Sequence, residues 1–321
     1  MELTFSFSGF QIIYSAIALF MWSFAALFSF EYMKKYEKKK RYYIFLFATF
    51  IATVGVFLAK DFYTLFVFFE AMSFTSYVWV VFDEKKESLA AGKTYLAVAV
   101  IGGMTMLMGI FLLYHLCGTL DFGQLSSLTK EIFEKGGEDA RLLRIACYLL
   151  FVGFGAKAGA FPMHIWLPKA HPVAPAPASA LLSGILTKTG IFGILIISCY
   201  LMVGQFSFFH FLMIVGTITM LFGGILGILS VNLKRTIACS SVSQIGFILV
   251  GIAMIGLLAA HNAHAARGTF LHMMNHSMFK LTLFMAAGVV YMNTHALDFN
   301  KIRGFGRKKP LLHFIFLSDL D

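Results

Sequence analysis

The stretch of sequence that decides the fold runs from Val152 to Pro177 and reads "VGFGAKAGAFPMHIWLPKAHPVAPAP". It begins as an apolar helix that contains a lysine, Lys157, and it then holds five of the chain's six prolines within sixteen residues. A proline inside a helix removes a backbone donor and clashes with the carbonyl group four residues earlier. We therefore predict a discontinuous helix over 145–177 that is broken near Pro162.

The residues around this stretch have the composition of a membrane protein. Hydrophobic residues make up 59% and charged residues 13% of the 321-residue chain, whereas roughly 25% of residues in a soluble domain are charged. The mean hydropathy is +0.80. Apolar runs near the ~20 residues that cross a bilayer predict nine transmembrane helices and a tenth that starts at Pro310. The nine predicted spans cover 10–30, 42–59, 62–82, 95–114, 145–161, 178–203, 206–231, 236–258 and 270–292.

The predicted fold class is all-α, a polytopic transmembrane helix bundle. A barrel is excluded because barrel strands alternate over about ten residues and these runs do not. Backbone groups freed at a helix break cannot face lipid. The segment after Pro162 is therefore expected to be buried in protein or to line a cavity. Among the loops, only 115–144 is long enough to hold a small element outside the bilayer.

The net charge of +10 reflects topology, so no nucleic-acid partner is expected. If the N-terminus faces outside and each span reverses direction, the loops around 31–43, 83–93, 232–235 and 300–309 fall on one side. These loops hold 16 of the 26 lysines and arginines, and the opposite loops hold 6. The positive-inside rule assigns the basic side to the cytoplasm, where contact with anionic lipid is expected.

The first ten residues, "MELTFSFSGF", lack the basic segment that precedes a cleavable signal peptide. We therefore expect the first helix to stay in a multi-pass protein of the cell (inner) membrane.

Cysteine usage points to no cofactor and no metal. The four cysteines lie far apart and form no CxxC pattern, so neither an iron–sulfur cluster nor structural zinc is indicated. They are expected to be small buried apolar residues: Cys117, Cys147, Cys199 and Cys239.

Four predicted spans contain an ionisable residue inside the apolar run: Glu70, Lys157, Lys188 and Lys280. A charge at the centre of a transmembrane helix costs about 2.5–3.5 kcal/mol on insertion scales. The structural alternative is a purely structural ion pair, or a lysine near a span end that lifts its ammonium group to the interface. Glu70 and Lys188 lie too deep in their spans for the side chain to reach the interface. Lys157, four residues before Phe161, lies nearest to the end of its span. We predict that all four serve function.

The last predicted span carries a polar stripe. His272, His276 and Lys280 are spaced four residues apart and so share one helix face over about 12 Å. Neutral imidazole accepts a proton on one nitrogen and donates from the other, so the stripe predicts a proton relay. Two alternatives stay open: histidines that hydrogen-bond neighbouring helices together, and, ranked last, a metal site.

Small and hydroxyl residues accompany these charges. Glycines flank Lys157 and Lys188, and "CSSVSQIG" opens the span that begins near residue 239. Small residues let helices approach closely and buried hydroxyls bridge to water, which is compatible with a wet path through the bundle. The secondary candidates on this path are His164, Lys169, Ser240, Ser243 and Gln244.

Four motifs in order resemble a known family. They are "FVFFEAMSFTSYVWV", "GFGAKAGAFPMHIWLPKAHPVAPAPASALLSGILTKTGIFGIL", "LKRTIACSSVSQIGFILVGI" and "HMMNHSMFKLTLFMAAGVVY". They resemble the signatures of the antiporter-like membrane subunits shared by respiratory complex I, membrane-bound nickel–iron hydrogenases and Mrp-type Na⁺/H⁺ antiporters. The sequence of the second motif is most similar to the corresponding motif of the large membrane subunits of hydrogenase-4 and formate hydrogenlyase.

The resemblance implies roles for the charged residues. Family members have fourteen spans with two inverted five-helix repeats, and these nine spans match the third to the eleventh. Glu70 then takes the place of the glutamate on span five, Lys157 of the lysine on the broken span seven, and Lys188 of the lysine on span eight. The stripe from His272 to Lys280 falls on span eleven, in the central polar axis.

The resemblance also implies the domain organisation. Residues 1–321 form one membrane domain, with a first five-helix repeat over 42–203 and an incomplete second repeat over 206–321. The first two family spans are absent, and the chain ends at "LLHFIFLSDLD", where the second broken helix of the family begins. A split subunit, a fragment and a frame-shifted reading all stay open.

The implied function is translocation of protons, or less readily Na⁺, driven by redox chemistry in partner subunits. The chain would be a subunit of a translocase or oxidoreductase with no redox centre of its own, bound to other membrane and peripheral subunits and to the bilayer. A buried pair of Glu70 with a lysine would act as the switch. When Glu70 is drawn away, the proton would pass along Lys157, Lys188, His276 and Lys280. The rival functions are an Mrp-type cation/proton antiporter subunit and a membrane scaffold that pumps nothing.

Overall fold

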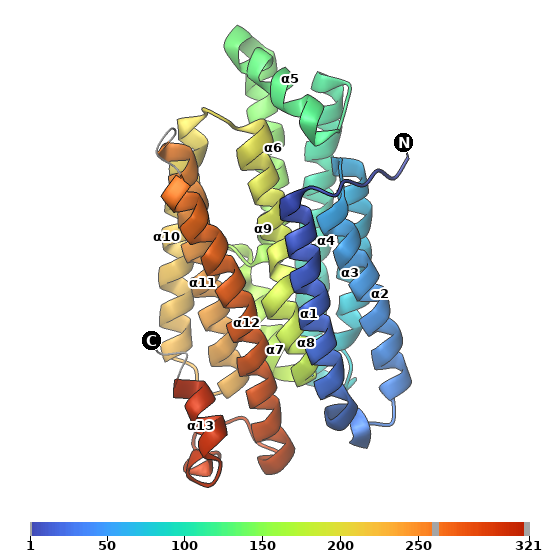
Figure 1. Cartoon of the computed structure of the whole chain (residues 1–321), viewed down its shortest axis with the longest axis vertical. Helices are drawn as coiled ribbons and strands as arrows, with labels where there is room; N and C mark the ends of the chain where they lie inside the picture. The colour runs from blue at the N-terminus through green and yellow to red at the C-terminus, as the bar shows by residue number, and fades with distance from the viewer. Residues whose placement is uncertain (1, 259–262, 318–321) are drawn as a thin grey trace.

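The computed structural model describes residues 2–258 and 263–317, and within them the fold is an all-α bundle (Figure 1). The first half contains α1 (Gly9–Tyr32), α2 (Lys39–Leu58), α3 (Phe62–Val80), α4 (Lys86–Cys117), α5 (Phe122–Lys135) and α6 (Gly137–Ala158). The second half contains α7 (Trp166–Val173), α8 (Ala176–Leu181), α9 (Thr187–Ile196), α10 (Phe206–Ile228), α11 (Leu233–Leu257), α12 (Ala263–Thr294) and α13 (Pro310–Leu317).

The predicted polytopic membrane bundle is confirmed, with a difference in the span count. Each of the nine predicted spans lies on helix, and seven helical segments of the described residues are long and apolar enough to cross a membrane. The other two predicted spans are α3 and α12, whose mean hydropathy is reduced by Glu70 and other polar groups and by the stripe from His272 to Lys280. The predicted element within 115–144 is α5, which lies across the top end of the bundle in Figure 1.

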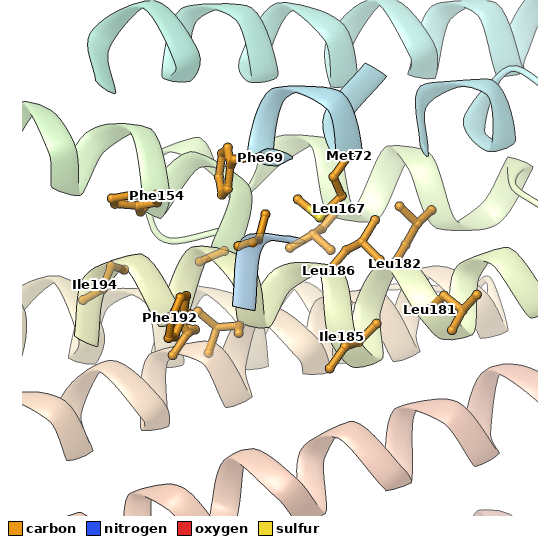
Figure 2. Packing of buried hydrophobic residues seen from close by; sticks show 14 of the residues in the cluster. Phe69, Met72, Phe154, Leu167, Leu181, Leu182, Ile185, Leu186, Phe192 and Ile194 are labelled. Carbon is orange, nitrogen blue, oxygen red and sulfur yellow. The ribbon is translucent and has the colours of Figure 1, made fainter. Parts of the chain in front are cut away.

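The central helix of the bundle runs from Ala176 to Leu201 and is almost entirely buried. It joins α8 and α9 through a five-residue π turn over Leu182–Leu186. Figure 2 shows Leu182 and Leu186 of this turn beside Met72 of α3. Because this helix packs on α6, α1 and α12, a charge on it is enclosed on every side by other helices.

The predicted discontinuous helix is confirmed, and its break begins earlier than Pro162. The first half, α6, ends at Ala158, because Gly159 adopts a left-handed conformation (φ 84°) and its N–H donates to Gly155 O. Glycine takes this conformation at little cost. A short 3₁₀ turn over Met163–Ile165 then leads into α7.

Protein groups satisfy the backbone that the break frees, as predicted from the cost of exposing it to lipid. Trp166 Nε1 donates to Ala156 O at 2.8 Å. Phe161 N donates to Thr219 Oγ1 of α10 at 3.0 Å. The break is therefore stabilised by one hydrogen bond from α7, the second half of the broken helix, and by one to the neighbouring α10.

The basic loops gather at one end of the bundle, the lower end in Figure 1. Glu84, between α3 and α4, forms ion pairs with Lys38 and Arg41 at the start of α2. The loop before α11 pairs with the segment after α12, where Leu233 N donates to Leu297 O at 2.8 Å. We call this end, formed by residues 33–41, 81–86, 232–235 and 295–309, the basic end.

Candidate functional site: a buried lysine–histidine axis

The axis is built around Lys188, which is fully buried on α9. Its Nζ lies 2.7 Å from His276 Nδ1 on α12 and donates to Ser183 O at 3.0 Å. Ser183 belongs to the π turn, where the backbone pattern changes and its carbonyl becomes available to a side chain. Such turns occur frequently at functional sites.

The predicted stripe on α12 is confirmed as geometry, and two of its members face inward. His276 is 2% exposed and Lys280 is 3% exposed. Lys280 Nζ donates to Ser240 Oγ of α11. A protonated Lys188 Nζ can only donate, so it would make His276 Nδ1 the acceptor and place the proton of a neutral ring on Nε2. His276 Nε2 is buried with no hydrogen-bond partner among the described residues, and so is His272 Nε2.

A second polar cluster surrounds Lys157 on α6. Its Nζ donates to Tyr95 OH of α4 at 2.7 Å and to Ser73 Oγ of α3 at 3.1 Å. Tyr95 OH is also 2.6 Å from Ser76 Oγ. A cavity of about 10 Å³ lies beside this cluster, lined by Lys157, Ser73, Tyr95 and Trp166 among others, and this is room for a single water molecule.

Glu70 does not form the predicted ion pair with a lysine. Within residues 2–258 and 263–317, no carboxylate lies within salt-bridge distance of Lys157 Nζ, because hydroxyl groups of α3 and α4 already bind it. Glu70 Oε1 is buried and has no hydrogen-bond partner in the described part of the chain. Gly103 leaves room for the carboxylate, since an added Cβ there would lie 2.5 Å from Glu70 Oε1.

The Lys157 side chain lies away from the carbonyl groups that the break frees at the end of α6. Trp166 Nε1 donates a hydrogen bond to the carbonyl group of Ala156, and Lys157 Nζ donates to side chains of α3 and α4. Gly190 brings the backbones of α6 and α9 together, because an added Cβ there would lie 2.6 Å from Ala158 N. The described residues give no hydrogen bond between Lys157 and Lys188, so the site consists of two clusters on neighbouring helices.

Some of the secondary candidates contact the axis, and others lie away from it. Ser240 contacts Lys280. His164 is buried, with its Nδ1 lacking a partner among the described residues, whereas Lys169 is exposed, 3.5 Å from Thr94 Oγ1. Among the described residues, neither Ser243 nor Gln244 forms a side-chain hydrogen bond to the axis. Their neighbour Ser241 does reach it, through a 2.6 Å contact with Ser183 Oγ.

The structure adds polar residues that the sequence patterns did not single out. His171 on α7 is fully buried, its ring stacks on Phe284 at 4.7 Å, and neither ring nitrogen has a partner in the described residues. Lys234 is 2% exposed, and its Nζ donates to Ala174 O at 2.8 Å. In the sequence Lys234 reads as a loop charge, because only the fold shows that the connection between α7 and α8 covers it.

In the described ranges, no three His, Cys, Asp or Glu side chains gather closely enough to hold a metal ion. The cysteines there are free; Cys147 and Cys239 are buried as expected, whereas Cys117 is half-buried and Cys199 is exposed.

The fold and the axis define a class: polytopic α-helical membrane proteins with a broken helix and ionisable side chains aligned inside the bundle. The chain belongs to the NADH:quinone oxidoreductase/Mrp antiporter transmembrane family, whose model matches residues 59–319. The family resemblance drawn from the four motifs is thereby confirmed.

Relatives from three kinds of complex match the chain. It is 34% identical over 316 residues to hydrogenase-4 component B of Escherichia coli (strain K12), covering 95% of this chain and 45% of that protein. It is 29% identical over 290 residues to an Na(+)/H(+) antiporter subunit of Alkalihalophilus pseudofirmus, covering 90% and 57%. It is 32% identical over 284 residues to NAD(P)H-quinone oxidoreductase chain 4-2 of Synechocystis sp., covering 87% and 48%. The chain therefore spans about half the length of these relatives.

A solved structure shares the fold. A chain of the membrane-bound sulfane sulfur reductase, an archaeal respiratory membrane complex, matches with a TM-score of 0.79 at 23% identity, covering 94% of this chain and 61% of that chain.

Proposed function

We propose that this chain translocates protons along the Lys188–His276 axis, as the antiporter-like subunit of a redox-driven membrane complex. The observation that carries the proposal is the 2.7 Å contact between two fully enclosed proton carriers, Lys188 Nζ and His276 Nδ1. Ionisable groups inside a membrane bundle are costly, and they commonly mark proton relays. The relatives' names, a hydrogenase component and a quinone oxidoreductase chain, support the redox-driven assignment.

Proton transfer across this contact needs no rearrangement of the helices. A proton that leaves Lys188 Nζ forms N–H at His276 Nδ1, and the N–H at Nε2 breaks to release a proton to the next group. Lys280, one turn further along the same face of α12, is the next ionisable group of the stripe. Ser240, which binds Lys280 Nζ, holds this ammonium group inward.

The Lys157 cluster is the proposed coupling element. Glu70 and Ser73 are three residues apart on α3 and so share a face, and Ser73 Oγ binds Lys157 Nζ. A shift of α3 would bring the unpartnered Oε1 of Glu70 toward the ammonium group in place of the hydroxyl. The proposed switch is therefore the replacement of the Ser73 hydroxyl by the Glu70 carboxylate at Lys157 Nζ, beside the water-sized cavity. It takes the place of the permanent ion pair expected from the sequence.

We also propose the wider organisation that the resemblance implies. Residues 42–203 form one five-helix repeat, and 206–321 form part of a second. The basic end faces the cytoplasm and the N-terminus faces outside, which the gathering of the basic loops at one end supports. Other membrane and peripheral subunits would supply the redox chemistry.

Proton flux in proteoliposomes tests the proposal. The full chain, with any subunits that co-purify, is reconstituted, and a K⁺ diffusion potential drives proton movement that a trapped pH dye reports. Lys188→Met removes the donor at similar length and is expected to lower the flux on the order of 100-fold, the scale of a lost acid–base group. Lys93→Met, an exposed lysine of α4, is the matched control and is expected to leave the flux unchanged. Equal flux in the two variants would refute the proposal.

The Mrp-type alternative is the second candidate, favoured by the similarity to the Na(+)/H(+) antiporter protein of Alkalihalophilus pseudofirmus. The same vesicles distinguish it, because exchange requires that an imposed Na⁺ gradient alone drive the dye signal. Proton translocation along the axis predicts a response to membrane potential in Na⁺-free buffer.

A further inference from the structure

The Ser183 carbonyl oxygen, which accepts from Lys188 Nζ at 3.0 Å, also accepts from a second side chain. Thr187 Oγ1 donates to the same oxygen at 2.8 Å. The backbone leaves this carbonyl group open to side chains, because the Thr187 N–H, its usual partner in an α-helix, donates to Leu182 O in the π turn. A carbonyl oxygen has two lone pairs, so a neutral hydroxyl group and the axis lysine share one buried acceptor.

Two hydroxyl groups tie this part of the π turn to α11. Ser241 Oγ donates to Ile237 O at 3.0 Å. A hydroxyl group has one hydrogen, so the 2.6 Å contact between the two serines is a hydrogen bond from Ser183 Oγ to Ser241 Oγ. Both serines are fully buried. The π turn is therefore fixed to a neighbouring helix at the residue whose carbonyl oxygen binds Lys188.

The preceding residue of α11, Ser240, binds the other lysine of the axis. Its Oγ accepts a hydrogen bond from Lys280 Nζ on α12. Two consecutive serines therefore hold the two lysines of the axis, one directly and one through Ser183. This arrangement makes α11 the helix that sets where both ammonium groups lie.

We propose that Thr187 and Ser241 are positioning residues for proton transfer from Lys188 to His276, and that both act through the carbonyl group of Ser183. This inference rests on the proposed function, since it concerns the same transfer. It goes beyond that function because neither residue carries a proton of the relay. Each is assigned instead to the geometry in which the lysine gives up its proton.

Ser241 sets the direction from which Lys188 faces His276. A protonated Lys188 directs N–H groups to Ser183 O at 3.0 Å and to His276 Nδ1 at 2.7 Å. When the second N–H bond breaks and one forms at Nδ1, the lone pair left on Nζ still faces that nitrogen, because the first hydrogen bond holds the amine. Without the bond between the two serines, the π turn and the amine that it binds lose this fixed orientation.

Thr187 keeps the carbonyl oxygen hydrogen-bonded while the charge of Lys188 changes. A hydrogen bond from an ammonium group is charge-assisted and about twice as strong as one from a neutral group, so the bond to Ser183 O weakens once the proton has left. A buried carbonyl group that depended on the lysine alone would favour retention of the proton. The Thr187 hydroxyl group donates to the oxygen in both states and so eases release of the proton.

The first test measures proton flux in the same proteoliposomes for three threonine variants of the central helix. Thr187→Val keeps the branched shape and removes the hydroxyl group, and we expect the flux to fall about tenfold. Thr187→Ser keeps the hydroxyl group and is expected to keep the flux near the wild-type value. The matched control is Thr189→Val, because Thr189 is equally buried and its Oγ1 donates to Leu186 O at 2.7 Å. This control is expected to leave the flux unchanged.

Unfolding in detergent separates positioning from packing. The two valine variants each lose one hydrogen bond from a buried hydroxyl group to a carbonyl group of the same helix, so we expect similar losses of stability. A role in packing alone predicts that the flux follows stability in both, and that Thr187→Ser, which loses a methyl group, is impaired more than Thr187→Val. Positioning predicts the opposite order at residue 187.

A second set of variants tests the bond between the two serines. Ser241→Ala is expected to lower the flux about tenfold. Its control is Ser198→Ala, which removes a buried hydroxyl group that donates to Ile194 O at 2.8 Å. The double variant Ser183→Ala, Ser241→Ala is expected to lower the flux no further than Ser241→Ala, because the two hydroxyl groups form one hydrogen bond. Reductions that multiply would overturn the role of this bond.

The outcomes separate this inference from the proposed function. Loss of flux in Lys188→Met, Thr187→Val and Ser241→Ala, with flux kept in Thr187→Ser and in both controls, supports the positioning roles. Loss in Lys188→Met with wild-type flux in Thr187→Val or Ser241→Ala overturns the role of that residue and leaves the axis standing, and so does an equal loss in its control. If one deletion variant does not fold, the comparison at the other residue decides the question. Wild-type flux in Lys188→Met overturns both proposals.

Discussion

The contact between Lys188 and His276 predicts a measurable coupling between two helices that are distant in sequence. The perturbation is a double-mutant cycle of Lys188→Met and His276→Leu, read as the free energy of unfolding. Interhelical hydrogen bonds in a membrane bundle average about 0.6 kcal/mol in such cycles, with a maximum of about 1.7 kcal/mol. Charge-assisted bonds are about twice as strong as neutral ones. A 2.7 Å contact to an ammonium group is therefore expected to give about 1.2 kcal/mol.

The assay is reversible unfolding of the purified chain in mixed micelles, followed by circular dichroism for the wild type, both single variants and the double variant. A coupling of about 1.2 kcal/mol is nearly tenfold in an unfolding constant, since about 1.36 kcal/mol is tenfold. The control cycle pairs Lys188→Met with Tyr95→Phe, because Tyr95 binds Lys157, and it is expected to be additive. A Lys188–His276 coupling within the roughly 0.3–0.5 kcal/mol of independent sites would refute the axis geometry.

Three further predictions follow from single residues. Gly159→Ala is expected to destabilise the chain by about 1–2 kcal/mol, because an L residue is strained at φ 84°. Gly268→Ala, with open space around its added Cβ, is the control. Equal unfolding temperatures of the two variants would contradict the reasoning. Tyr95→Phe removes a hydroxyl that binds Lys157 and is expected to cost about 1 kcal/mol in the same unfolding assay, so an unchanged midpoint would count against the cluster. Hydrogen bonds from its two basic partners lower the pKa of Glu84 from 4.5 to about 2. The stability these bonds add is present above pH 4.5 and lost as the pH falls toward 2, so the difference in Tm between wild type and Glu84→Gln should shrink over that range and not grow.

The sequence predicted the features that depend on local chemistry. Five prolines were enough to place the discontinuous helix, and the depth of Glu70 and Lys188 in apolar runs was enough to mark them. The break itself starts at Gly159, because a left-handed glycine ends α6 before the proline ring is reached. The four-residue spacing of the α12 stripe predicted its shared face correctly.

The contacts between helices could not be predicted from sequence. The partner of Lys188 is on α12, 88 residues away, and the partners of Lys157 are hydroxyl groups on α3 and α4. A single sequence does not show which helices pack together. The same limit explains why Lys234 reads as a loop charge and why His171 does not stand out inside the quoted stretch: their burial depends on how the connection between α7 and α8 folds over the basic end.

If the axis couples proton movement to redox chemistry in a larger complex, the number of protons moved per electron depends on Lys188. The complex is purified through a tag on this chain, reconstituted, and measured for electron transfer and proton movement together, with wild-type Lys188 and with Lys188→Met. We expect electron transfer to continue in the variant while the number of protons moved per electron falls. An unchanged ratio in a fully assembled variant complex would contradict it and would assign the chain to the non-pumping scaffold.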